Sequence, residues 1–168
     1  KNKQNGTNEI FRERTHELCD AEVTRQLLPE TIAALRRLEG DLKAAGIAGV
    51  TACDLAENVQ ASERAVLLEI APSYRVPLHV ASVAGISGVQ FIDRESRLTV
   101  GYGSPYVTDR IDISGAPMSL THHVQSFFQG NRFLLSHLAS RVLEQVPGGQ
   151  VAELYAGVGL FAVALAAR

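Results

Sequence analysis

The sequence has little cysteine, no tryptophan and no marked excess of charge of either sign. It contains two cysteines in 168 residues, and its formal net charge is −2. Cys19 and Cys53 are too few and too far apart for a disulfide framework or a cysteine-rich metal site. The near balance of charge predicts no strong basic patch of the kind that marks a nucleic-acid-binding domain.

Long hydrophobic runs are also absent. No stretch reaches the length that spans a membrane, and the polar N-terminus carries no signal-peptide pattern. With 46% hydrophobic and 20% charged residues, the composition is that of a soluble globular protein, and we expect a cytoplasmic location without membrane contact. The chain begins at Lys1, has its one methionine at Met118, and ends within a helical pattern. We therefore interpret it as an internal fragment of a longer protein.

The first two thirds of the chain predict a strand-rich α+β domain. Apolar residues recur at helical spacing over residues 29–45, with Pro29 in the first turn and Gly46 as the stop signal. Alternating patterns predict strands, listed in chain order: within 9–23, then 47–59, 65–71, 88–92, 97–102, 106–113 and 117–124. The last four are expected to form two hairpins. Residues 78–84 fit either a helix or a strand. We place this central domain at residues 1–113 and the start of a second domain at residues 114–168.

The last third of the chain has the strongest local pattern. An apolar stripe predicts a helix that ends at Pro147, followed by a strand over residues 150–155, a turn at residues 157–159 and a second helix over residues 160–167. A strand that enters a helix through a glycine turn directs free backbone N–H groups and the positive end of the helix toward a cleft. This pattern predicts the entrance of a cofactor-binding site.

The glycine turn alone leaves three alternatives open. Gly157, Gly159 and Ala162 have the spacing of a dinucleotide-binding turn. Glu153, just before the turn, favours S-adenosylmethionine (SAM) instead. The third alternative is a structural turn that binds no ligand. The acidic ribose partner of a dinucleotide site is expected about twenty residues later, which falls beyond Arg168.

Two motifs together resemble the RNA uracil-C5 methyltransferase family. Residues 126–131 read Ser-Phe-Phe-Gln-Gly-Asn, and residues 153–159 read Glu-Leu-Tyr-Ala-Gly-Val-Gly. The family carries Phe-Phe-Gln-x-Asn, an amphipathic helix, and then Asp-Leu-Tyr-Cys-Gly-x-Gly. Ala156 stands in place of the family's usual cysteine, and Gly130 in place of its usual valine. The resemblance continues weakly at residues 106–109 and 11–14.

The resemblance implies a fold, a cofactor and a set of binding residues. It implies a central α+β domain followed by the helix, first strand and glycine turn of a class I SAM-dependent methyltransferase domain of the Rossmann-like α/β type. The implied cofactor is SAM, held by Gln129, Tyr155, Gly157 and Gly159. From the residues alone, Gln129 also fits a helix-capping role, and Tyr155 fits a core position with its hydroxyl at the rim. We expect Asn131 to hold the local turn or to cap the helix.

The resemblance also implies a reaction and a partner, tRNA or rRNA. In this family a cysteine thiolate adds to C6 of uridine, C5 is methylated, and a base removes the C5 proton. The family's cysteine and base follow the glycine turn, so we expect both beyond Arg168, no catalytic residue in this chain and no activity of the fragment alone. Two alternatives remain: another Rossmann-type enzyme, such as a different methyltransferase or a nicotinamide-dependent enzyme, and a non-catalytic RNA-binding relative.

Metal sites are not expected. Many family members hold an iron–sulfur cluster through four cysteines, and Thr24 stands where one of these is expected, so we predict no cluster. His122 and His123 are adjacent in a predicted strand and should point to opposite faces of it. The incomplete sheet of the second domain has an unpaired edge, which predicts that the fragment self-associates or is partly disordered near its C-terminus.

Overall fold

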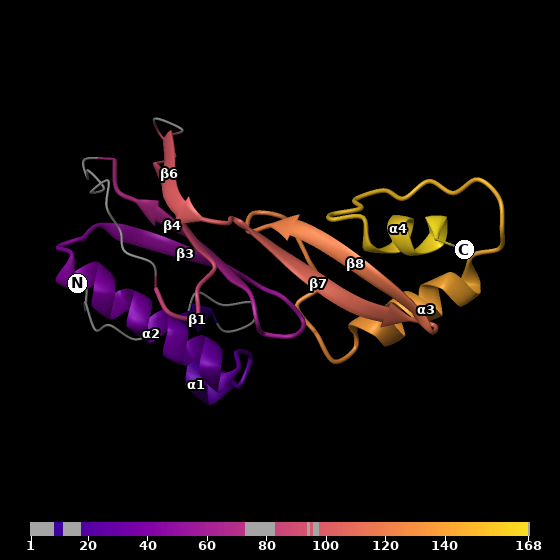
Figure 1. The fold of residues 1–168 in the computed structure, drawn as a ribbon, viewed down its shortest axis with the longest axis horizontal. Helices are drawn as coiled ribbons and strands as arrows, with labels where there is room; N and C mark the ends of the chain where they lie inside the picture. Colours follow the sequence, from indigo (N-terminus) through magenta and orange to yellow (C-terminus); the bar gives the residue numbers. More distant parts are fainter. Residues whose placement is uncertain (1–8, 12–17, 73–82, 94, 96–97, 168) are drawn as a thin grey trace.

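A computed structural model describes residues 9–11, 18–72, 83–93, 95 and 98–167 of the chain. Its elements run from β1 to β8 and from α1 to α4 (Figure 1). In chain order they are β1 (Glu9–Phe11), β2 (Leu18–Asp20), α1 (Ala21–Thr24), α2 (Pro29–Ala44), β3 (Val50–Glu57), β4 (Arg64–Ile70), β5 (Gly88–Asp93), β6 (Leu98–Gly103), β7 (Tyr106–Ile113), β8 (Ala116–His123), α3 (Leu135–Gln145) and α4 (Leu160–Ala166).

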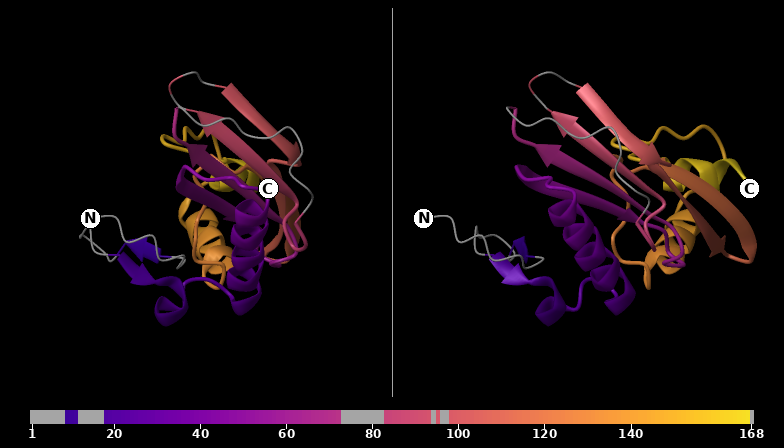
Figure 2. Two further views of the ribbon diagram at one scale, coloured as in Figure 1. Left: turned by 90° about the vertical axis from the view of Figure 1, so that its left-hand side faces the viewer. Right: turned by 60° about the vertical axis from the view of Figure 1, so that its left-hand side comes forward.

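The first region is a four-stranded sheet with α2 packed along one face (Figures 1 and 2). The strand order is β3-β4-β5-β6, with β4 and β5 parallel and the two outer pairs antiparallel. The apolar stripe of α2 packs on the inner residues of the sheet; these buried residues include Ala34, Leu35, Leu38, Leu42, Val66, Leu68, Val89 and Phe91. The predicted helix and the strands of this sheet are confirmed.

The second region is a long β-hairpin that leaves the sheet and carries the last two helices (Figure 1). β7 pairs with β8 across the turn at Ser114 and Gly115, where both residues have positive φ. The inner face of the hairpin packs against α3 and α4 in a second apolar cluster; its buried members are Ile111, Ile113, Leu120, Leu135, Ala139, Leu143, Leu160 and Ala164. The predicted hairpin is confirmed. The predicted domain boundary at residues 113 and 114 falls at its turn, and the division into two domains stays a prediction.

The turn between β3 and β4 joins the two regions through buried polar contacts. The Asn58 side chain is fully buried and donates from Nδ2 to the carbonyl oxygen of Thr108 at 3.0 Å. The backbone N–H of Thr108 in turn donates to Oε2 of Glu63 at 2.8 Å. Since buried polar groups need such partners, these bonds fix where β7 starts relative to the sheet.

The predicted strand over residues 150–155 is wrong for this structure. Among the described residues no strand pairs with this segment, and Leu154 is 82% exposed. A strand needs at least one neighbouring strand to pair its backbone N–H and C=O groups, and the described part of the chain offers this segment none. The chain therefore has a mixed α/β fold, while the start of a Rossmann-like domain stays a proposal.

Other boundaries also differ from the prediction. The helix that follows residues 126–131 begins at Leu135 rather than directly after the motif, because Asn131 closes a separate turn. Its Oδ1 accepts the backbone N–H groups of Phe133 and Leu134, each at 3.2 Å, which confirms the predicted turn-holding role. The predicted strand within residues 9–23 is a pair of short strands, β1 and β2, followed by α1. Residues 78–82 of the ambiguous apolar stretch lie outside the described residues. No helix in the described part of the chain is long and apolar enough to cross a membrane.

Candidate functional site

The two motifs that the sequence singles out are in contact. The glycine turn packs on the segment at residues 126–131, and a Cβ on Gly157 would lie 2.9 Å from the carbonyl oxygen of Phe127. Gly157 also has φ +58°, a region that L side chains rarely adopt. Phe128 and Val158 then pack against the same apolar cluster. Gly157 is therefore required by the close approach of the first motif, whatever else the turn binds.

The turn leads into α4 in a defined geometry. Gly159 precedes the helix at φ +77°, and its backbone N–H donates to the carbonyl oxygen of Ala156 at 2.8 Å. Oε2 of Glu153 accepts the backbone N–H of Ala162 at 2.8 Å. A carboxylate that accepts from the first turn of a helix satisfies an otherwise unpaired donor and interacts favourably with the helix dipole. Glu153 thus fixes the turn between the extended segment and α4.

Gln129 is half-buried beside a cavity of about 200 Å³. The polar residues around this cavity come from distant parts of the chain; they include Gln26, Glu57, His122, Ser126 and Arg132. The cavity lies where the first region, the hairpin and the first motif meet. The amide of Gln129 is therefore surrounded by groups that donate and accept hydrogen bonds.

Tyr155 lies apart from this cavity. Its residue surface is 103% exposed relative to the reference value, and its backbone has φ +57°. A positive φ at a residue other than glycine costs about 1–3 kcal/mol and often marks a functional site. Gly157 and Gly159 do not line the cavity either. The structure thus brings the backbones of the two motifs together but does not bring the side chains of Gln129 and Tyr155 into one pocket.

A buried charge network next to Gln129 is a feature that the sequence analysis missed. Glu57 at the end of β3 accepts hydrogen bonds from Thr31 of α2, from Arg132, and from Arg64 Nε at 2.5 Å. Arg132 also donates to the carbonyl oxygen of Val59 at 3.2 Å. The network ties the segment after the first motif to the sheet. No local pattern signals it, since Glu57 and Arg132 are 75 positions apart.

A second missed feature is the pair of His122 and Asp109 in the hairpin. His122 Nε2 lies 3.0 Å from Asp109 Oδ2, and both side chains are almost completely buried. The ring of His122 stacks on Phe128 with centroids 4.5 Å apart. A signal was present: Asp109 occupies an inward position of β7, between the apolar residues Val107 and Ile111.

The two adjacent histidines point to opposite faces of β8, as predicted. The ring of His123 contacts Tyr106 on the outer face of the hairpin, with centroids 5.1 Å apart. Within the described ranges, no three His, Cys, Asp or Glu side chains are grouped so as to hold a metal ion. Thr24 lies in α1, and its side chain is outside the description, so the predicted lack of an iron–sulfur cluster stays a prediction.

No family model matches the sequence. The chain is similar to the tRNA (uracil(54)-C(5))-methyltransferase of Pyrococcus horikoshii, with 34% identity over 67 residues. It is also similar to the enzyme of the same name from Pyrococcus abyssi, with 33% identity over 67 residues. Each alignment covers 40% of this chain and 16% of the relative. The aligned part is therefore about a sixth of the length of these curated relatives.

The fold is similar to that of a solved structure, the tRNA (uracil-54, C5)-methyltransferase of Pyrococcus abyssi in complex with S-adenosyl-L-homocysteine. The superposition has a TM-score of 0.62 and 20% identity, and it covers 94% of this chain and 43% of the other. At this identity the likeness shows a shared fold. Together with the curated relatives, it confirms the resemblance to the RNA uracil-C5 methyltransferase family that the two motifs predict.

Proposed function

We propose that this chain is part of a SAM-dependent RNA methyltransferase that methylates C5 of uridine in tRNA. The observation that carries the proposal is the packing of the glycine turn on the Phe-Phe-Gln segment, at Gly157 and Phe127. The names of the similar enzymes support tRNA rather than rRNA as the substrate. Since the aligned part covers 16% of those enzymes, the activity is proposed for the whole protein and not for this chain by itself.

The two motifs carry the residues for which the resemblance implies a cofactor, SAM. When bound, SAM supplies an electrophilic methyl group. We propose that Gln129, Tyr155, Gly157 and Gly159 hold it: the glutamine amide both donates and accepts hydrogen bonds, and the exposed tyrosine ring offers a flat apolar surface. Gly159 has nothing closer than 3.9 Å to an added Cβ, so its backbone is open to a ligand.

The nucleophile and the general base are proposed to lie outside this chain. C5 of uracil is a poor nucleophile until a thiolate adds to C6, so the reaction needs a cysteine beside the base. Cys53 is a free thiol on β3 and does not line the cavity at Gln129. We therefore propose that the reaction passes through a covalent cysteine–RNA intermediate formed elsewhere in the whole protein, and that the fragment alone is inactive.

Two lesser proposals concern the surroundings of the protein. A cytoplasmic location follows from the proposed tRNA substrate. Self-association of the fragment follows from its exposed apolar residues after Ser126; these include Phe127, Phe133, Val151 and Leu154. Sedimentation at several concentrations tests the second point, since a strictly monomeric fragment would contradict it.

The experiment that tests the main proposal uses the intact protein, a tRNA transcript and SAM. We expect 5-methyluridine in the digested tRNA and release of tritium from C5 of labelled uridine. Gln129→Ala should raise the KM for SAM about tenfold, the loss of one good hydrogen-bonding interaction. Gln125→Ala is the matched control, because Gln125 is an exposed glutamine four positions earlier.

The alternatives give different results in the same assay. A different methyltransferase would consume SAM without releasing tritium from uridine, and a nicotinamide-dependent enzyme would bind NADH in place of SAM. A non-catalytic relative would bind RNA and leave SAM unchanged. Any of these outcomes would overturn the proposed methylation of uridine C5.

A further inference from the structure

The strongest unassigned feature is the buried pair of His122 and Asp109, which lies directly under the first motif. The Asp109 side chain is 0% exposed and the His122 side chain 3% exposed. Burying a carboxylate costs several kcal/mol unless it is paired and hydrogen-bonded, so such a pair needs a physical reason to persist. Apolar residues, Val107 and Ile111, occupy the neighbouring inward positions of β7.

The hydrogen bonds fix the orientation of the imidazole ring. Asp109 Oδ1 accepts the backbone N–H of Val59 at 2.6 Å, and Oδ2 faces His122 Nε2 at 3.0 Å. Because an ionised carboxylate only accepts, Nε2 carries the proton and donates a hydrogen bond to Asp109. Nδ1 lies 3.5 Å from the carbonyl oxygen of His123. With the proton on Nε2, Nδ1 has no hydrogen to donate to that oxygen, so the bond to Asp109 and the stacking on Phe128 are the contacts that restrict rotation of the ring.

The imidazole ring of His122, held in this orientation, packs against Phe128. The two rings stack at 4.5 Å with an angle of 21° between their planes. Phe128 also packs against the apolar cluster of the second region, as do Val158 of the glycine turn and Phe161 of α4. The next residue, Gln129, lines the same cavity as His122. A change in the imidazole orientation would therefore move Phe128 and, with it, the backbone that carries Gln129.

We propose that His122 and Asp109 are positioning residues that hold Phe128, and through it Gln129, in the orientation that binds the cofactor. This inference rests on the proposed function of the Gln129 site. It assigns the pair no contact with the cofactor and no part in proton transfer. Its effect is on the affinity for SAM, because the pair sets where the glutamine amide lies.

The kinetic test uses the intact protein with tRNA and SAM. His122→Ala should raise the KM for SAM about tenfold, with kcat and the KM for tRNA changed less than about twofold, since only a binding interaction is displaced. Asp109→Ala should weaken the affinity for SAM, and Asp109→Asn should weaken it much less. The asparagine amide can still accept the backbone N–H of Val59 and form a hydrogen bond with the ring of His122. His137→Ala is the control, since His137 is exposed on α3.

A second measurement does not depend on turnover. In ¹⁵N-labelled intact protein, His122 of the wild type should carry its proton on Nε2. In Asp109→Asn, the new side-chain amide should donate to Nε2 of His122, and the proton of the ring should then lie on Nδ1. The side-chain amide resonances of Gln129 should shift in His122→Ala and stay close to wild type in Asp109→Asn. His122→Phe leaves the ring at this position without its hydrogen bond to Asp109, so it should shift the same Gln129 resonances, and it replaces His122→Ala if that variant does not fold.

The outcomes separate this inference from the proposed function. If wild type lacks methyltransferase activity but the Gln129 resonances move in the His122 variants, the pair positions Gln129 and the proposed function is wrong. If wild type methylates tRNA and the His122 variants keep both the KM for SAM and the Gln129 resonances, the positioning role is wrong. An equal loss of kcat and of both affinities would also overturn it, because that pattern indicates a general loss of folded protein.

Discussion

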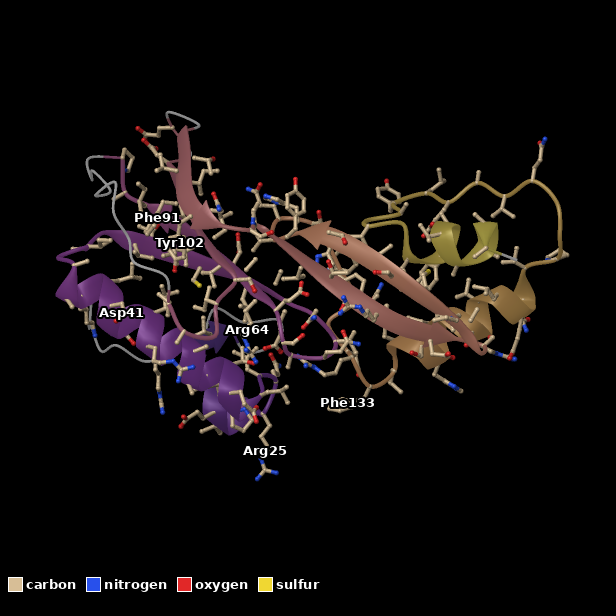
Figure 3. All side chains as sticks on the ribbon, in the orientation of Figure 1. Arg25, Asp41, Arg64, Phe91, Tyr102 and Phe133 are labelled. Atoms are coloured by element: carbon tan, nitrogen blue, oxygen red, sulfur yellow. The ribbon has the colours of Figure 1, made fainter. Side chains whose placement is uncertain are left out.

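The sheet with α2 and the segment after Ser126 are both rich in apolar residues, yet they bury them to very different extents. Val66, Val89 and Phe91 in the sheet are at most 2% exposed. Phe133 and Leu154 in the later segment are 84% and 82% exposed, and Phe133 projects away from the ribbon (Figure 3). The sheet thus buries its apolar residues, whereas the segment after Ser126 leaves part of its apolar residues exposed.

The comparison of β4 with residues 150–155 shows that an apolar sequence pattern forms a strand only where a partner strand is available. β4 is buried on both faces because β3 and β5 pair with it, α2 covers one face, and Val107 and Val124 cover the other. Residues 150–155 are as apolar in pattern but have no partner in the described chain. Their exposed surface is the kind that marks an interaction site in a soluble protein.

The largest expected effect on the free energy of unfolding comes from replacing one phenylalanine by alanine in each of the two regions. Phe91→Ala should lower the free energy of unfolding by about 3–5 kcal/mol, because it opens a cavity in a packed core. Phe133→Ala should change it by less than about 0.5 kcal/mol, since its ring is exposed. Urea unfolding followed by circular dichroism measures both. Similar losses in the two variants would break the comparison.

The charge network between the regions should show the next largest effect. Glu57→Ala leaves the buried Arg64 and the half-buried Arg132 without their carboxylate, and we expect a loss of about 3 kcal/mol, the lower end for breaking a buried pair. Glu144→Ala removes an exposed partner of Arg141 and should cost less than about 1 kcal/mol. The same unfolding assay applies. A Glu57 variant as stable as the Glu144 control would show that the network does not hold the two regions together.

A smaller effect is expected where the two motifs touch. Gly157→Ala should destabilise the contact by about 1–3 kcal/mol, because its φ is positive and the added Cβ meets the backbone of Phe127. Gly148→Ala is the control, since nothing lies within 4 Å of its added Cβ. Hydrogen exchange over residues 126–131 should speed up in the first variant alone. Equal exchange in both would mean that the motifs are not coupled.

The smallest expected effect is a pH dependence confined to the first region. Burial raises the pKa of Tyr102 above 10.0, the charge of Asp41 raises it further, and a hydrogen bond from the backbone of Val83 lowers it. The folded state therefore favours the neutral phenol, so this contribution to stability is complete below pH 10.0 and is lost as the pH rises above it. The difference in tyrosinate absorbance between wild type and Tyr102→Phe should have its midpoint above that of free tyrosine. A midpoint at or below the free value would contradict the burial argument.

The local features of this protein were predictable from sequence because they depend on near neighbours. The helical spacing of Ile32, Leu35, Leu38 and Leu42 predicted α2, and the alternation over residues 106–113 predicted β7. The two motifs were likewise recognisable as short strings. The turn-holding role of Asn131 followed from its side chain, which reaches donors only two and three residues away.

Tertiary structure decided what depends on contacts between distant residues. Glu57 meets Arg132 across 75 positions, and Asp109 meets His122 only because the register of β7 and β8 puts both on the inner face. It also decided that residues 150–155 stay unpaired and that the Tyr155 ring lies apart from the cavity at Gln129. Sequence periodicity fixes which face of an element is apolar, but pairing partners, burial and the convergence of side chains on one cavity arise only when distant elements pack together.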